Sequence, residues 1–91
     1  MSILKRILQK GHLEIVKLLL QKKANVNAKS LDGRIPLFYA VANGHLEVVK
    51  LLLEKGADIN YNNKGVTSLQ IARDQNKLDV ADYLISQGAK E

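Results

Sequence analysis

Residues 44–60 read GHLEVVKLLLEKGADIN, and this stretch decides the fold because the chain contains it more than once. Residues 11–27 read GHLEIVKLLLQKKANVN, which is nearly the same sequence at an offset of 33 residues. A third, more divergent copy follows at an offset of 32, as LDVADYLISQGA at residues 78–89. Self-similarity at a fixed period of about 20 to 50 residues is typical of proteins in which each unit packs mainly on its neighbours. The sequence therefore predicts three stacked units.

Each unit is predicted to fold as two short helices and a loop. Pro36 suits the first position of a helix, because its missing N–H needs no partner there. Apolar residues recur at the spacing of one helix face before Asn43-Gly44 and again before Gly56, and glycine commonly ends a helix. The polar residues 58–65 are predicted to form an extended turn. The apolar positions are Leu37, Ala40 and Val41 in the first helix and Leu46, Val49, Leu52 and Leu53 in the second.

The stretch GRIPL at residues 33–37, together with residues 44–60, resembles the ankyrin repeat, and the resemblance covers essentially the whole chain. It implies an all-α ankyrin-repeat solenoid, in which helix–turn–helix units stack and extended β-turn loops join them. We expect a single domain over residues 1–91, with repeats at approximately 1–31, 32–63 and 64–91.

The third repeat departs most from the family pattern. Where the family has Thr-Pro-Leu-His, the second repeat reads IPLF at residues 35–38 and the third reads TSLQ at residues 67–70. The third repeat also has Asn-Lys in place of Gly-His at residues 76–77. The loop that precedes Gly65 is one residue shorter than the loop that precedes Gly33.

Both ends of the chain carry polar residues where the middle repeat is apolar. The terminal units of a solenoid must turn a polar face to water. We therefore favour a self-contained stack of three repeats over a slice of a longer array. In the alignment, Lys5 and Arg6 stand where the second repeat has Phe38 and Tyr39, and Arg73 and Asp74 stand where it has Val41 and Ala42.

The formal net charge of +5 is concentrated in the first third of the chain. Residues 1–33 hold seven basic and two acidic side chains, whereas residues 34–91 hold seven of each. A basic patch at Lys5, Arg6 and Lys10 could attract phosphate or an acidic protein, although a solvated face is the simpler interpretation. Residues 1–37 contain no aromatic side chain that could stack on a base, so nucleic-acid binding is not favoured.

Residues that could carry catalysis are few. The only histidines, His12 and His45, occupy the same place in two repeats, which indicates a structural role in the scaffold. The chain has no cysteine and no Gly-rich phosphate loop. We therefore expect no enzymatic activity, no cofactor and no metal. No apolar run approaches the roughly 18 residues that span a bilayer, and no signal peptide is recognisable, so we predict an intracellular, cytoplasmic monomer.

The surface is then the most informative part of the sequence. Ankyrin-repeat proteins resemble one another in binding partners through the turn tips and the exposed side of the first helix of each repeat. Leu31 is an apolar residue at a turn tip, and Phe38 and Tyr39 would suit the anchored centre of an interface, unless they pack between repeats. The positions carried over are Leu31, Asp32, Arg34, Phe38, Tyr39, Ala42 and Asn43 in the second repeat, Lys64, Val66, Gln70, Asp74 and Gln75 in the third, and Lys5, Arg6, Gln9 and Lys10 in the first.

Three functions follow from these observations. The leading hypothesis is a non-catalytic protein-binding module that presents a rigid concave surface to another protein. The second is an electrostatic adaptor that binds nucleic acid or an anionic surface through the basic first repeat. The third is a structural or model repeat stack without a dedicated partner, although the irregular third repeat is unlike an idealised design.

One residue also suggests a covalent modification. Asn60 has Leu52 eight residues before it and Asp58 two before it. This spacing resembles the ankyrin-repeat target of an asparaginyl hydroxylase found in animals. The simpler interpretation is a structural asparagine that closes the turn by hydrogen bonds between its side chain and the backbone.

Overall fold

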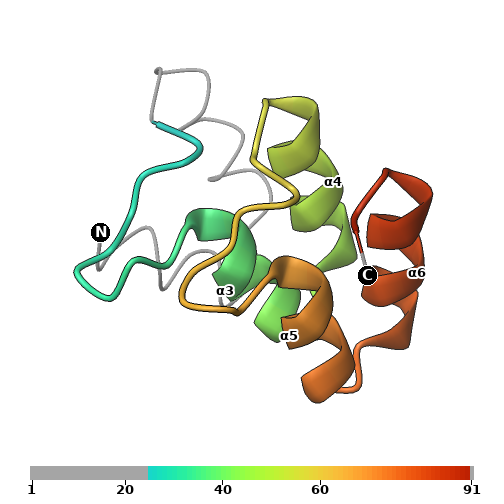
Figure 1. The fold of residues 1–91 in the computed structure, drawn as a ribbon. Coiled ribbons are helices and arrows are strands. Elements are labelled where there is room, and N and C mark those ends of the chain that lie inside the picture. Colours follow the sequence, from blue (N-terminus) through green and yellow to red (C-terminus); the bar gives the residue numbers. More distant parts are fainter. Residues whose placement is uncertain (1–24, 91) are drawn as a thin grey trace.

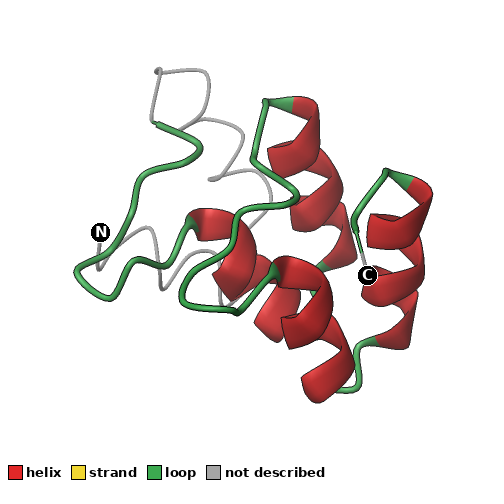
Figure 2. Ribbon diagram, in the orientation of Figure 1, coloured by secondary structure: helices red, strands yellow, loops and turns green. Residues whose placement is uncertain are grey.

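The computed structural model of the chain describes residues 25–90, which contain four helices and one isolated β-bridge. Helix α3 spans Pro36–Ala42, α4 spans Leu46–Glu54, α5 spans Ser68–Asp74 and α6 spans Leu78–Ser86. No strand forms in this part of the chain (Figure 2). Helix α3 lies beside α5 and α4 beside α6, and both long loops lie on the side of α3 and α5 (Figure 1). Two helical hairpins therefore stack to make an inner and an outer layer of helices.

The helices of the second repeat begin and end where the sequence predicts. Pro36 is the first residue of α3, and Ile35 before it is extended, with φ −100° and ψ 162°. The proline ring disfavours the helical region for the preceding residue, so the helix starts sharply. Helix α3 is followed by Asn43 and Gly44, and Gly44 adopts a φ of +70°. The left-handed region is costly for residues with a Cβ atom, which explains the glycine.

A continuous apolar core lies between the two layers. Fully burying one aliphatic side chain contributes about 1.5 to 3 kcal/mol to the free energy of unfolding. The stacked hairpins bury many such side chains, as expected of repeats that pack on their neighbours. The buried aliphatic residues are Leu37 and Val41 in α3, Val48, Val49, Leu51 and Leu52 in α4, Leu69 in α5 and Val80 and Leu84 in α6, together with Ile35.

The two loops turn in different ways, which accounts for the missing residue in the third repeat. In the first loop, the N–H of Ser30 donates to the carbonyl oxygen of Arg34 at 2.8 Å, which leaves three residues in the turn. In the second, Asn63 and Val66 exchange two backbone hydrogen bonds of 2.9 and 3.0 Å around a two-residue turn. Lys64 and Gly65 in that turn have φ values of +54° and +90°. Positive φ at both central positions is the type I′ geometry of tight hairpins.

Asparagine side chains connect each repeat to the backbone of the next. The Asn27 Oδ1 accepts a hydrogen bond from the N–H of Asp58 at 2.9 Å, and its Nδ2 donates to the carbonyl oxygen of Gly56 at 3.1 Å. At the equivalent place, the Asn60 Oδ1 accepts from the N–H of Lys90 at 2.9 Å. These bonds fix the register of one repeat on the next.

The turns are also bound to each other. The Tyr61 hydroxyl donates to the carbonyl oxygen of Gly33 at 2.7 Å, and the Asn63 Nδ2 donates to the carbonyl oxygen of Asp32 at 3.0 Å. A Cβ atom on Gly33 would lie 2.7 Å from the Asn63 Oδ1, so the second turn packs directly on the first. The loops are therefore an ordered part of the stack.

Several predictions fall on residues 1–24, outside the residues that the structure describes. These are the basic patch of Lys5, Arg6 and Lys10, the partner position Gln9 and the structural role of His12. Within residues 25–90, no helix has the length and apolar character needed to cross a membrane.

Candidate functional site

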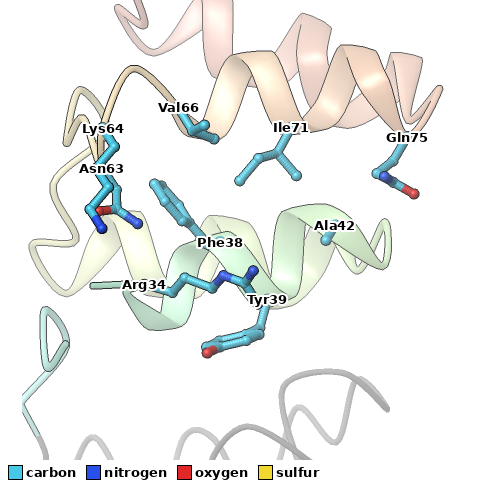
Figure 3. Close-up of a pocket in the computed structure, with 9 residues that line it drawn as sticks. All are labelled: Arg34, Phe38, Tyr39, Ala42, Asn63, Lys64, Val66, Ile71 and Gln75. Atoms are coloured by element: carbon cyan, nitrogen blue, oxygen red, sulfur yellow. The ribbon is translucent and has the colours of Figure 1, made fainter. Parts of the chain in front are cut away.

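A groove of about 480 Å³ opens between α3 and α5, with the second loop at one end (Figure 3). Ligand pockets in proteins commonly have volumes of about 300 to 1,000 Å³. One wall comes from α3 and Arg34, two residues before it, and the opposite wall comes from α5 and the second loop. The lining residues are Arg34, Phe38, Tyr39, Ala42, Asn63, Lys64, Val66, Ile71 and Gln75.

The middle of the groove is apolar. Val66 and Ile71 project from one wall toward the Phe38 ring on the other (Figure 3). Val66 remains 38% exposed and Ile71 is half-buried, so both can still lose surface to a partner. Exposed apolar side chains that line a concavity are typical of a binding site rather than of ordinary surface.

Two basic side chains line the groove. Arg34 and Lys64 are exposed, and neither forms an ion pair with any residue between 25 and 90. The Arg34 side chain extends along α3 toward Tyr39 (Figure 3). Among the described residues that line the groove there is no aspartate or glutamate, and these residues carry two formal positive charges.

Phe38 and Tyr39 lie at the floor of the groove, and they are not the exposed anchors that the sequence suggested. Their exposed fractions are only 3% and 6%. Phe38 packs against Tyr61, and the centroids of the two rings are 5.7 Å apart. The Lys29 Nζ lies 5.1 Å from the centroid of the same Tyr61 ring. Both residues are therefore buried rather than exposed, and Phe38 packs on the Tyr61 ring. The repeat alignment gives no hint of this packing, because the first loop has Ala28 at the position of Tyr61.

The other predicted partner residues lie in four places. Arg34, Lys64, Val66, Gln75 and Ala42 line the groove with the two aromatic residues. Leu31 is fully exposed at the tip of the first loop, next to Asp32, outside the groove lining. Asn43 is exposed at the end of α3, where its Nδ2 donates to the carbonyl oxygen of Tyr39 at 2.9 Å. Asp74 and Gln70 lie in a separate hollow that also includes Arg73 and Lys90.

Two residues of the groove, Asn63 and Ile71, are absent from the sequence prediction. Ile71 aligns with Tyr39 at the offset of 32. Ile71 would therefore have been predicted if every partner position of the second repeat had been carried over to the third. Asn63 has no such signal, because its position depends on the two-residue turn that follows it.

The described residues hold no arrangement suited to catalysis by a metal. Between residues 25 and 90, no group of three or more histidine, aspartate or glutamate side chains could hold a metal ion. His45 lies half-buried immediately before α4, in the connection between the two helices of its repeat. The groove therefore offers contact chemistry: apolar surface, two cations and amide groups.

The Asn60 side chain bonds the backbone, as the simpler interpretation expects, but it accepts from the N–H of Lys90 in the next repeat and does not close its own turn. The N–H of Asn60 donates to the Asp58 carboxylate at 3.2 Å. Asn60 is nevertheless exposed. Its hydroxylation stays a prediction, which mass spectrometry of the Asn60 peptide after incubation with the enzyme would test.

Comparison with known proteins identifies the family. A search of curated proteins gives no match. The family model described as ankyrin repeats in three copies matches residues 4–91. That match spans nearly the whole chain and agrees with the stacked helical hairpins and the loops bound between them. The chain therefore belongs to the ankyrin-repeat family.

Proposed function

We propose that this protein is a non-catalytic module that binds another protein through the groove between α3 and α5 and the adjoining loop tips. Ankyrin repeats generally mediate protein–protein interaction. The observation that carries the proposal is the exposed apolar surface of Val66 and Ile71 inside a concavity, on a scaffold whose loops are bonded together. A surface that is already ordered loses little conformational entropy on binding.

Rigid presentation follows from the contacts beneath the groove. Phe38 and Tyr39 are buried, and Asn63 is held by its bond to Asp32. The side chains on top of this floor therefore project from fixed backbone positions. Such pre-organisation favours an interface that changes little in shape when the partner binds.

The test begins with a partner captured from the source cell and then compares variants of the groove with one of the outer layer. Val66→Ser, Ile71→Ser and Arg34→Ala should each raise the dissociation constant at least about fivefold, as truncations at the centre of an interface do. Tyr39 is a poor choice for this test, because truncating a buried residue would damage the fold. Circular dichroism and a melting curve establish that each variant is folded.

The control lies on the opposite face of the molecule. Lys50, on α4, is unsuitable because its Nζ lies 5.3 Å from the Tyr83 ring centroid and 3.7 Å from the Glu47 carboxylate. Glu54, at the exposed end of α4, is better, and Glu54→Ala should leave the dissociation constant unchanged. Loss of binding in Glu54→Ala with normal binding in the groove variants would reject the proposed surface.

A salt titration separates this proposal from the electrostatic adaptor. Binding driven by phosphate contacts weakens steeply as ionic strength rises, whereas apolar contacts in a groove are much less sensitive. The absence of enzymatic activity and an intracellular location stay predictions of the sequence, and both belong to this proposal.

A further inference from the structure

We propose that the groove recognises an acidic peptide segment in which an apolar side chain lies next to a carboxylate. This inference rests on the proposed function and names the chemistry of the partner. The apolar side chain would occupy the space between Val66 and Ile71 above Phe38, and the carboxylate would pair with one of the two basic side chains of the groove, Arg34 or Lys64.

The apolar requirement comes from the middle of the groove. Val66, Ile71 and Phe38 face one another across a space into which none of the charged side chains drawn in Figure 3 projects. A polar partner group placed there would lose its hydrogen bonds to water without replacement, which costs free energy. A branched aliphatic or aromatic side chain has no hydrogen bonds to water to lose, and it would cover the exposed part of Val66.

The acidic requirement comes from the two basic side chains that line the groove. Arg34 and Lys64 line the same cavity, and no carboxylate of the described residues neutralises either of them by an ion pair. Lys29 adds a third positive charge beside the loops, where its Nζ lies 5.1 Å from the Tyr61 ring centroid. Asp32 is the acidic residue of this loop, and it does not line the groove. An arginine offers a planar fork of donors that matches a carboxylate.

The far end of the groove suits a peptide backbone. Gln75 lies at that end, beside Ala42, and its amide can both donate and accept a hydrogen bond (Figure 3). The small Ala42 side chain leaves room for a main chain to pass. The groove therefore combines cationic, apolar and amide groups along its length.

The same observations favour a peptide over a nucleic acid. Proteins that bind single-stranded nucleic acid stack bases on the faces of exposed aromatic rings. Phe38 and Tyr39 are almost fully buried, so their ring faces are not available, and the accessible walls of the groove are aliphatic. Aliphatic walls beside cations match an apolar side chain that is followed by a carboxylate.

Selection from a phage-displayed library of random linear peptides tests this inference directly. The wild-type chain should enrich peptides in which Asp or Glu lies close to an aliphatic or aromatic residue. The doubly reversed variant Arg34→Glu with Lys64→Glu should enrich basic peptides with a similar apolar residue. A peptide selected on the wild-type chain should bind the reversed variant at least about tenfold more weakly at an ionic strength of about 0.15 M, measured by fluorescence anisotropy.

A matched control changes the same net charge elsewhere. Lys55 and Lys90 are exposed and do not line the groove, so Lys55→Glu with Lys90→Glu should keep the wild-type preference and affinity. Melting curves of both double variants establish that they are folded. A reversed preference in this control would show that overall charge, and not the groove, selects the peptides.

The possible failures of the two proposals differ. Peptides that depend on Val66 and Ile71 but show no acidic preference would overturn the inference and leave the proposed binding groove standing. Strong binding of single-stranded oligonucleotides that Arg34→Glu with Lys64→Glu abolishes would also overturn it. Peptides whose affinity is unaffected by Ile71→Ser and by the charge reversal, or no enrichment at all, would count against both the inference and the groove.

Discussion

Helices α3 and α5 hold equivalent places in successive repeats, yet their surroundings differ. Helix α3 buries every residue except Ala42, whereas α5 buries only Ser68, Leu69 and Ala72. Val41 is fully buried, and Arg73 at the equivalent position in α5 is exposed. The two helices pack on each other, and each also packs on the second helix of its own repeat. The difference teaches that the repeat pattern determines where a helix forms, but not how much of that helix is buried.

The outer helices show the same contrast less completely. Leu46 and Leu53 in α4 are half-buried, whereas the equivalent Leu78 in α6 is 60% exposed and Ile85 is also exposed. The polar substitutions of the third repeat therefore cover only part of the end of the described stack. Below this surface the two hairpins have the same interior, since Leu52 and Leu84 are both buried.

The largest expected effect tests that shared interior. Leu52→Ala and Leu84→Ala should each lower the free energy of unfolding by about 2 to 5 kcal/mol, because each leaves a cavity among buried side chains. In a domain of this size, each kcal/mol lowers the melting temperature by about 4 to 8 °C. Leu78→Ala, in the same helix as Leu84 but exposed, should stay within about 0.5 kcal/mol of wild type in urea unfolding. A loss of under half a kcal/mol in Leu52→Ala would mean that the helix register is wrong.

The second prediction compares the two turns. Gly33→Ala should cost about 2 to 3 kcal/mol, because its φ is +80° and the new Cβ would displace the Asn63 side chain. Gly65→Ala, with φ +90° and no atom within 4 Å of the new Cβ, should cost only the backbone penalty of about 1 to 2 kcal/mol. Thermal unfolding gives both values. If the contact with Asn63 is the cause, the difference between the two glycines should disappear in an Asn63→Ala background.

A third prediction makes the third repeat more like the second. Ser68 is the first residue of α5, as Pro36 is of α3, and its buried hydroxyl has no hydrogen-bond partner. Thr67 before it is already extended, with φ −116° and ψ 165°, as a residue before proline must be. Ser68→Pro should therefore raise the free energy of unfolding by about 1 kcal/mol. Ser68→Ala removes the hydroxyl alone, so a comparison of the two by denaturant unfolding isolates the effect of the ring.

The smallest expected effect concerns the shortened turn. Lys64 has a φ of +54°, a region in which asparagine is more favourable than lysine. Lys64→Asn should stabilise the fold by about 0.5 kcal/mol and at the same time weaken binding of an acidic peptide. Parallel measurements of the melting temperature and the dissociation constant test both parts. A stabilised variant with unchanged peptide affinity would remove Lys64 from the binding site.

Much of this fold was predictable from the sequence, because its determinants are local. Pro36 and Gly44 limit α3, the spacing of leucines defines α4, and the repeat offset transfers both helices to residues 68–86. The burial of Phe38 was not predictable in the same way, because it depends on Tyr61, which has no counterpart in the other loop. Local periodicity fixes the elements, and contacts between loops fix the shape of the groove.

The candidate site was predicted in part for a related reason. Arg34, Lys64 and Val66 follow from the resemblance of turn tips between ankyrin repeats, and the structure brings all three to one groove. Asn63 reaches it only because the second turn is one residue shorter than the first and packs on Gly33. A pattern that aligns repeats by their common residues gives no information about the consequences of a deletion.

The asparagine bonds between repeats have a consequence for how such a chain can lengthen. Each bond joins an amide side chain in one unit to a backbone N–H in the next, and every residue except proline supplies that N–H. The donors here are Asp58 and Lys90, which carry opposite charges at the same place. If a segment of 33 codons were duplicated, the new repeat would therefore form the same hydrogen bond to its neighbour. The residue that supplies the N–H could then change its side chain without losing the bond.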